Sequence, residues 1–166
     1  SNCTDCHYTH QLEVRAEECS VCHPEVDSAE DLPAIRMSNV DYDGDGDTEE
    51  GIAGEIETLH EALYAAMQAY SSSVSGNAVV YESHSYPYFF NDTNGNGVAD
   101  PDEAVRDNAF VGWTPRLLRA AYNYQYVAKD PGAYAHNPKY IIQVLYDNLE
   151  DLGQQTAVDM TGMVRP

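Results

Sequence analysis

Residues 3–7 read Cys-Thr-Asp-Cys-His and residues 19–23 read Cys-Ser-Val-Cys-His. These two segments use all four cysteines of the chain. Two thiols at this spacing can form thioethers to the vinyl groups of one porphyrin, and the next histidine then lies under the iron as an axial ligand. The predicted attachment residues are Cys3, Cys6 and His7 for one haem and Cys19, Cys22 and His23 for a second.

A zinc site and a redox-active cysteine pair are the alternatives to haem attachment, because both also use a Cys-x-x-Cys pair. A single such pair would leave all three readings open. Here the pair occurs twice, and histidine follows it both times. The repeated motif therefore favours two molecules of haem c.

The charge of the chain excludes some partners. Its 166 residues include 8 Lys and Arg against 28 Asp and Glu, a net charge of −20, so nucleic acid is not an expected partner.

No apolar run approaches the roughly 20 residues that cross a bilayer, so no membrane span is predicted. The chain begins with Ser1 and no apolar leader, which suggests a processed chain or a fragment.

Each haem iron has a second face, and four histidines remain to serve as distal ligands. They are His10, His60, His84 and His136. Methionine is the competing ligand and would raise the reduction potential, whereas a second histidine usually accompanies a low potential. The methionines are Met37, Met67, Met160 and Met163.

Two of the remaining histidines have informative surroundings. His10 follows His7 by three residues, too few to wrap around a porphyrin, so we expect His10 to bind a neighbouring haem. His136 precedes Asn137 and Pro138, an expected helix N-cap and first-turn proline that would hold it on a defined backbone. The alternatives are a surface histidine and a hydrogen-bonded loop histidine.

The other two histidines are less clearly marked. His84 follows a short apolar run and precedes an aromatic loop that could line the edge of a haem. His60 falls on the apolar face of an expected helix, where a structural core histidine is an equal alternative. Four candidates exceed the two distal positions. Either some are structural, or they bind haems of another subunit or of a part of the protein outside this chain.

Two acidic stretches match the twelve-residue calcium loop of EF-hands, in which oxygen ligands surround a sharp glycine turn. The expected ligands of the first are Asn39, Asp41, Asp43, Asp45, Asp47 and Glu50. Those of the second are Asp92, Asn94, Asn96, Val98, Asp100 and Glu103. We therefore expect about two structural calcium ions. The first loop also permits a register that begins at Asp41, and a solvated acidic turn is the alternative for both.

The chain divides by pattern into two parts. Residues 1–35 are expected to form a dihaem attachment segment with haem as its core, and residues 36–166 a helical part that carries the calcium loops and distal histidines. Helices are expected at 49–70, 114–127 and 138–152, and a short strand at 78–81. The expected fold is mainly α with extensive irregular loops. The tail after residue 153 could be an arm that packs on a neighbour.

Three segments together resemble multihaem c-type cytochromes of anaerobic, metal-respiring and thermophilic prokaryotes. They are residues 3–10, the loop around Gly97, and residues 112–140. The resemblance implies that His10 serves a neighbouring haem and that His136, followed by Asn137 and Pro138, is a distal ligand. Some relatives are extracellular and polymerise into cytochrome nanowires. This chain departs from most of them in having only two attachment motifs.

The predicted function is electron transfer through bis-histidine haems. No catalytic pattern appears, and irons closed on both faces offer no position for a substrate, so no enzyme is expected. We expect a location outside the cell or on its surface, assembly of copies into a conductive filament through haem-to-haem contacts, and other redox proteins or extracellular acceptors as partners. A soluble periplasmic electron shuttle is the alternative. A haem peroxidase or sensor and a calcium-dependent surface module are further alternatives.

Overall fold

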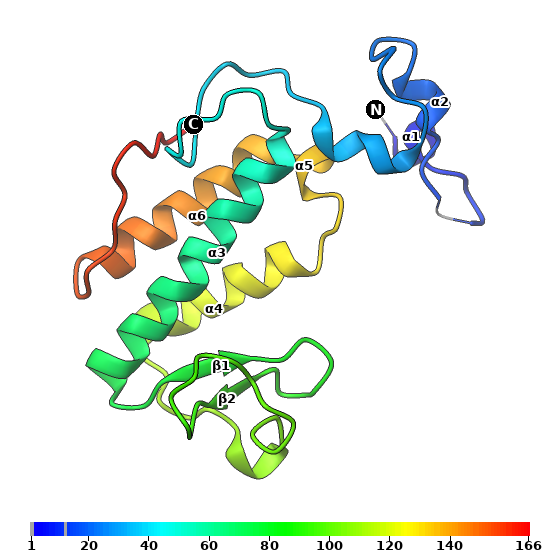
Figure 1. Cartoon of the computed structure of the whole chain (residues 1–166). Helices are drawn as coiled ribbons and strands as arrows, with labels where there is room; N and C mark the ends of the chain where they lie inside the picture. Colours follow the sequence, from blue (N-terminus) through cyan, green and yellow to red (C-terminus); the bar gives the residue numbers. More distant parts are fainter. Residues whose placement is uncertain (1, 12) are drawn as a thin grey trace.

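A bundle of three helices forms the centre of the computed structural model, which describes residues 2–11 and 13–166 (Figure 1). The helices are α3 (Ile52–Tyr70), α4 (Pro115–Ala128) and α6 (Pro138–Gly153), and each contacts the other two. Their fully buried side chains include Leu59, Leu63 and Met67 of α3, Leu117 of α4, and Ile142, Leu145, Leu149 and Leu152 of α6. The mainly α fold and the three expected helices are confirmed.

Two of these helices begin at the proline that the sequence singles out. Pro115 opens α4, and the hydroxyl of Thr114 accepts a hydrogen bond from the backbone N–H of Leu117 at 3.1 Å. Pro138 opens α6 directly after Asn137. A first-turn proline removes an N–H group that would have no partner within the helix. The starts of both helices are therefore local properties of the sequence.

The short elements lie at the two ends of the bundle (Figure 1). At one end lie α1 (Cys3–Cys6) and α2 (Ala16–Cys19), the 3-10 turn η1 (Ala29–Ala34) and the one-turn helix α5 (Ala133–His136). At the other end lies a small antiparallel sheet of β1 (Val79–Tyr81) and β2 (Phe89–Asn91), in which Val80 pairs with Phe90. A π-helical turn (η2, Ser71–Ser75) extends α3, and a 3-10 turn (η3, Arg106–Asn108) follows the second acidic loop.

The C-terminal tail folds back onto its own chain, whereas the sequence suggested an arm that reaches a neighbour. The backbone N–H of Val164 donates to the carbonyl of Tyr42 at 2.9 Å. Gly44 has a φ of 81°, and a Cβ there would lie 2.5 Å from the carbonyl carbon of Gly162. Only glycine allows this contact between the tail and the first acidic loop. Met160 and Met163 pack against the core from the same tail.

Within the part of the chain that the structure describes, we find no helix with the length and apolar character needed to span a bilayer.

Candidate haem site

Both attachment motifs contain the same backbone hydrogen bond. The backbone N–H of His7 donates to the carbonyl of Cys3 at 2.9 Å, and that of His23 donates to the carbonyl of Cys19 at 3.0 Å. All four cysteines are free thiols. The hydrogen bond returns each histidine to the first cysteine of its motif. Two thiols and one imidazole are thus held together over five residues, as attachment to one porphyrin requires.

A cavity of about 780 Å³ lies between the N-terminal segment and the end of the bundle. Cys6, His7 and Cys19 line it from the N-terminal segment, and His136 lines it from α5. Much of its remaining wall is apolar and includes Val14, Leu32, Ile35, Ile52 and Tyr134. Its size and mainly apolar lining are typical of cofactor pockets.

Two histidines of this cavity lie at a separation that suits a shared iron. The ring centroids of His7 and His136 are 6.3 Å apart, with the rings tilted by 50°. Two imidazoles on opposite faces of one metal ion, each with a metal–nitrogen bond of about 2 Å, have centroids about 6 Å apart. The residues present therefore fit a haem iron between His7 and His136.

The imidazole of His136 is oriented by its neighbours. Its Nδ1 lies 2.9 and 3.0 Å from the two carboxylate oxygens of Asp130, which can only accept, so Nδ1 carries the proton. Nε2 is then the nitrogen left to bind a metal, the usual arrangement of a carboxylate behind a metal-binding histidine. A Cβ on Gly132 would lie 2.7 Å from Cε1 of His136, so glycine lets the ring lie against the backbone.

His23 and His84 have the same kind of support. Nδ1 of His23 lies 3.1 Å from Oε1 of Glu25, and Nδ1 of His84 lies 3.0 Å from Oε1 of Glu82. The hydrogen bond from the backbone N–H of His84 lowers the pKa of Glu82, so this carboxylate stays ionised. The side chain of His84 is 92% exposed. His84 therefore presents Nε2 to the outside of the molecule.

His60 has surroundings of a different kind. Its Nε2 lies 2.9 Å from the carbonyl oxygen of Tyr124, and its ring stacks on the Tyr124 ring with centroids 4.0 Å apart. Burial lowers the pKa of His60, so the ring is neutral. These contacts favour the structural alternative for His60 that the sequence left open. His10 is exposed, and neither His10 nor His84 is among the described residues that line the cavity.

The methionines are distributed unequally with respect to the cavity. Met37 lines the cavity and is 91% exposed, whereas Met67 is fully buried in the core. Met160 and Met163 pack against the core from the tail. Among the described residues, Met37 is thus the methionine placed to compete with histidine for an iron in the cavity.

The two acidic loops share one hydrogen-bonding pattern. Asp41 accepts hydrogen bonds from the backbone N–H groups of the third and fifth residues after it, at 2.6 and 2.9 Å, and Asp92 does the same at 2.7 and 2.8 Å. Asp43 and Asn94 each accept one from the second residue after them. The first loop thus follows the register that begins at Asp41, and Asn39 precedes it.

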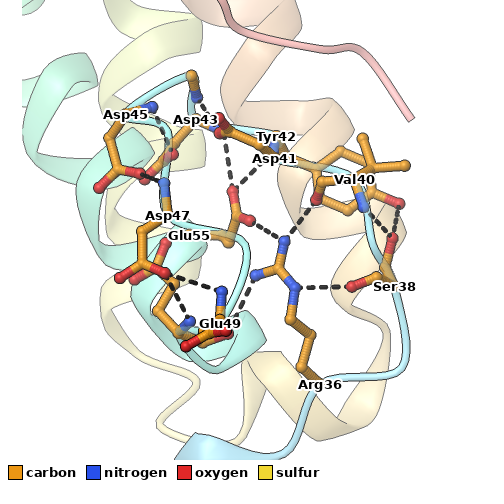
Figure 2. A network of polar contacts seen from close by, with 12 residues as sticks. Arg36, Ser38, Val40, Asp41, Tyr42, Asp43, Asp45, Asp47, Glu49 and Glu55 are labelled. Carbon is orange, nitrogen blue, oxygen red and sulfur yellow. Dashed lines mark hydrogen bonds and ion pairs between the residues drawn. The ribbon is translucent and has the colours of Figure 1, made fainter.

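The closing glutamate of the first loop comes from α3. In the second loop, Glu103 accepts hydrogen bonds from the backbone N–H groups of the second and third loop residues at 2.6 and 3.2 Å. Glu55 does so in the first loop at 2.7 and 2.8 Å (Figure 2). The sequence assigned this place to Glu50. A twelve-residue spacing could not identify Glu55, because it lies beyond the loop in the first turn of the helix.

Glu50 also lies at the first loop. Its carboxylate forms one group with those of Asp43 and Asp45, in which the oxygen atoms lie within 4.8 Å of one another. Burial and the neighbouring carboxylates raise the pKa of Glu50 to about 7, and burial with the charge of Glu55 raises that of Asp43 to about 6. The first loop therefore carries carboxylates that resist ionisation without a cation.

Known relatives of the chain are of one kind. It is 33% identical over 111 residues, 62% of its length, to the C-type polyheme cytochrome OmcC of Geobacter sulfurreducens. It is 33% identical over 105 residues, 58% of its length, to the C-type polyheme cytochrome OmcB of the same organism. The chain spans 14% of the length of each of these relatives. No protein-family model matches the chain, and no solved structure matches it significantly.

These relatives confirm the predicted resemblance to multihaem c-type cytochromes. The shared identity extends over about 60% of the chain and is therefore not limited to ten motif residues. The chain is homologous, over that part, to c-type cytochromes that carry several haems.

Proposed function

We propose that this chain is an electron-transfer module of a multihaem c-type cytochrome, with one haem c on each attachment motif. The observation that carries the proposal is the pair of His7 and His136, 6.3 Å apart in a cofactor-sized cavity that Cys6 also lines. Haem supplies an iron that is reversibly reduced by one electron. The chain spans only 14% of the length of these relatives. Its membership of a larger multihaem protein, and the activity of that protein, are therefore part of the proposal.

The residues of the first site have separate roles in this proposal. Cys3 and Cys6 would attach the porphyrin, and His7 and His136 would bind its iron. Asp130 holds the proton on Nδ1 of His136 and keeps its Nε2 directed at the metal. With two histidine ligands, the iron would offer no position to a substrate. Electron transfer rather than catalysis follows.

The second site lies close to the first. Cys19 lines the same cavity as Cys6. Burial and the charge of nearby Cys6 raise the pKa of the Cys19 thiol. Porphyrins attached there would share one cavity, which supports electron exchange between them. His23, supported by Glu25, is the proposed proximal ligand there.

The distal ligand of the second haem is proposed to come from a neighbour. His84 is the outward-facing histidine with a supporting carboxylate, and His10 is exposed on the segment between the two motifs. We propose that they bind haems of a second copy of the chain, outside the cell or on its surface, so that copies assemble into a conductive filament. Size-exclusion chromatography tests this, because a monodisperse monomer of the haem-loaded chain contradicts it.

The two acidic loops are proposed calcium sites. In the second loop, Asp92, Asn94, Asn96, Asp100 and Glu103 keep the EF-hand spacing, and Gly97 adopts the positive φ of 78° that its sharp turn needs. Oxygen ligands of this kind suit a hard divalent cation. Bound cations would also offset part of the net charge of −20.

Haem counting tests the proposed function most simply. The pyridine haemochrome assay and the intact mass of the purified chain should agree on two porphyrins for each polypeptide. Carbon monoxide added to the reduced, assembled protein should leave the Soret band in place, because each iron would then have two histidine ligands. A colourless chain would contradict the proposal. A carbon monoxide adduct would instead support a haem peroxidase or sensor.

A further inference from the structure

The first acidic loop holds more negative charge than nearby cations balance. Five carboxylates form two overlapping groups, in each of which the oxygen atoms lie within 4.8 Å of one another. They are Asp41, Asp43, Asp45, Glu50 and Glu55. The guanidinium of Arg36 pairs with Glu55 (Figure 2). Carboxylates this close repel one another, and one guanidinium offsets only part of that repulsion.

Asp43 gives an independent sign that a ligand belongs here. The residue is 4% exposed, and its Oδ1 accepts a hydrogen bond from the backbone N–H of Asp45 at 3.2 Å. Its Oδ2 is buried and has no hydrogen-bond partner, and Oε1 of Glu50 is in the same condition. A buried carboxylate oxygen without a donor is destabilising unless a cation binds it. Two such oxygens in one cluster point to a cation between them.

We propose that Glu55 of α3 closes the calcium site that the proposed function places at this loop, so that one hard divalent cation binds both the loop and the helix. Asp41, Asp43 and Asp45 supply the loop ligands, and Glu50 supplies a further carboxylate. Calcium takes six to eight oxygen ligands in flexible arrangements, which suits carboxylates from a loop and a helix together. The cation then joins the loop to α3.

Tyr42 connects this site to the haem cavity. Its backbone N–H donates to Glu55 at 2.7 Å, and its carbonyl accepts from Val164 of the tail. Its hydroxyl lies 3.1 Å from Oγ of Ser38, and both residues line the cavity. The cation therefore also fixes one wall of the cavity. This coupling rests on the proposed haem, whereas the binding of the cation does not.

Calcium titration of the EDTA-treated, haem-loaded chain tests the site, with the unfolding temperature and the heat of binding as readouts. In D43N the buried carboxylate, whose Oδ2 has no hydrogen-bond partner, is replaced by a neutral group of similar shape. We expect D43N to unfold at a higher temperature than wild type in EDTA and to bind calcium at the first loop at least about tenfold more weakly. E55Q should lose affinity to a similar degree.

Two variants serve as controls. E57Q changes an exposed glutamate of the same helix and should bind calcium as wild type does. D92N disables the second loop and should leave the response of the first loop intact. Equal calcium affinity of D43N and wild type, or loss of all binding in D92N, would overturn the site. E55Q that binds like wild type would overturn the role of Glu55.

Circular dichroism in the Soret region tests the coupling to the cavity. We expect calcium to change the signal of wild type and not that of D43N. A wild-type signal that is insensitive to calcium would overturn the coupling. A colourless chain that still binds calcium would overturn the haem proposal and the coupling but would support the cation site, so these failures can be told apart.

Discussion

The two attachment motifs share one backbone hydrogen bond but have different surroundings. In both, the histidine N–H donates to the first cysteine of the motif. His7 then faces His136 across a cavity, whereas His23, among the residues that the structure describes, has no ring contact with a second histidine. The local sequence thus defines where a haem is attached, and the tertiary structure defines what lies on its far face. In the proposed arrangement, the chain would offer an internal distal ligand, His136, for one of two haems.

Removal of the attachment thiols should have the largest effect on haem content and stability, and the effect should differ between the two motifs. The double variant C3S/C6S should lose the mass of one porphyrin. Its fold should also become less stable, because the cavity lined by His7 and His136 would then be empty. C19S/C22S should also lose one porphyrin but keep the helical bundle. Intact mass spectrometry and far-ultraviolet circular dichroism measure both results. Equal losses of helix in the two variants would contradict the difference between the sites.

Changes to the carboxylates that support His136 and His23 should shift the reduction potentials of the two haems separately. D130N removes the charge behind His136, so the affinity of His136 for the iron should fall by roughly tenfold or more and the potential of the first haem should rise. E25Q should shift the second haem in the same direction and leave the first unchanged. A spectroelectrochemical titration resolves the two potentials. If D130N and E25Q moved the same haem, the assignment of these carboxylates would be wrong.

The smallest effect is expected from His60, the histidine with structural contacts. Burial lowers the pKa of His60 in the folded chain, so the unfolded chain binds a proton more readily. Stability from this group is present above its ordinary pKa of about 6.5 and is lost as the pH falls below that value. H60Q should reduce the loss of stability between neutral and mildly acidic pH, as measured by denaturant unfolding.

The haem spectra decide whether His60 has a second role. H60Q should leave both haem spectra unchanged, and H84Q, at an exposed histidine, serves as the control for acid stability. A haem lost or altered in H60Q would make His60 a distal ligand and would weaken the case for a neighbour's histidine at the second haem.

Local patterns of the sequence predicted much of this molecule. The helix starts at Pro115 and Pro138 and the strand at 78–81 depend on neighbouring residues, and all three are present. The partner of that strand, Phe89–Asn91, was not identified, because an aromatic turn with Pro87 conceals its short pattern. The tail also escaped prediction, since its contact with Gly44 depends on the folded loop.

The candidate sites also combine residues that the local sequence predicted with residues that only the fold brings together. The five residues of each attachment motif are contiguous, so spacing alone predicted them. The role of Glu55 depends on how α3 approaches the loop, and the pairing of His7 with His136 joins residues 129 positions apart (136 − 7). Neither arrangement leaves a signal in the linear sequence. The sequence named His136 as a ligand but not the iron that it would serve.

The most direct measurement is electron paramagnetic resonance of the haem-loaded H136G variant, before and after addition of imidazole. We predict that one of the two low-spin haem signals is replaced by a high-spin signal in H136G and returns when imidazole fills the space of the missing side chain. The other haem signal should not change. Two unaltered low-spin signals in H136G would contradict an iron held between His7 and His136.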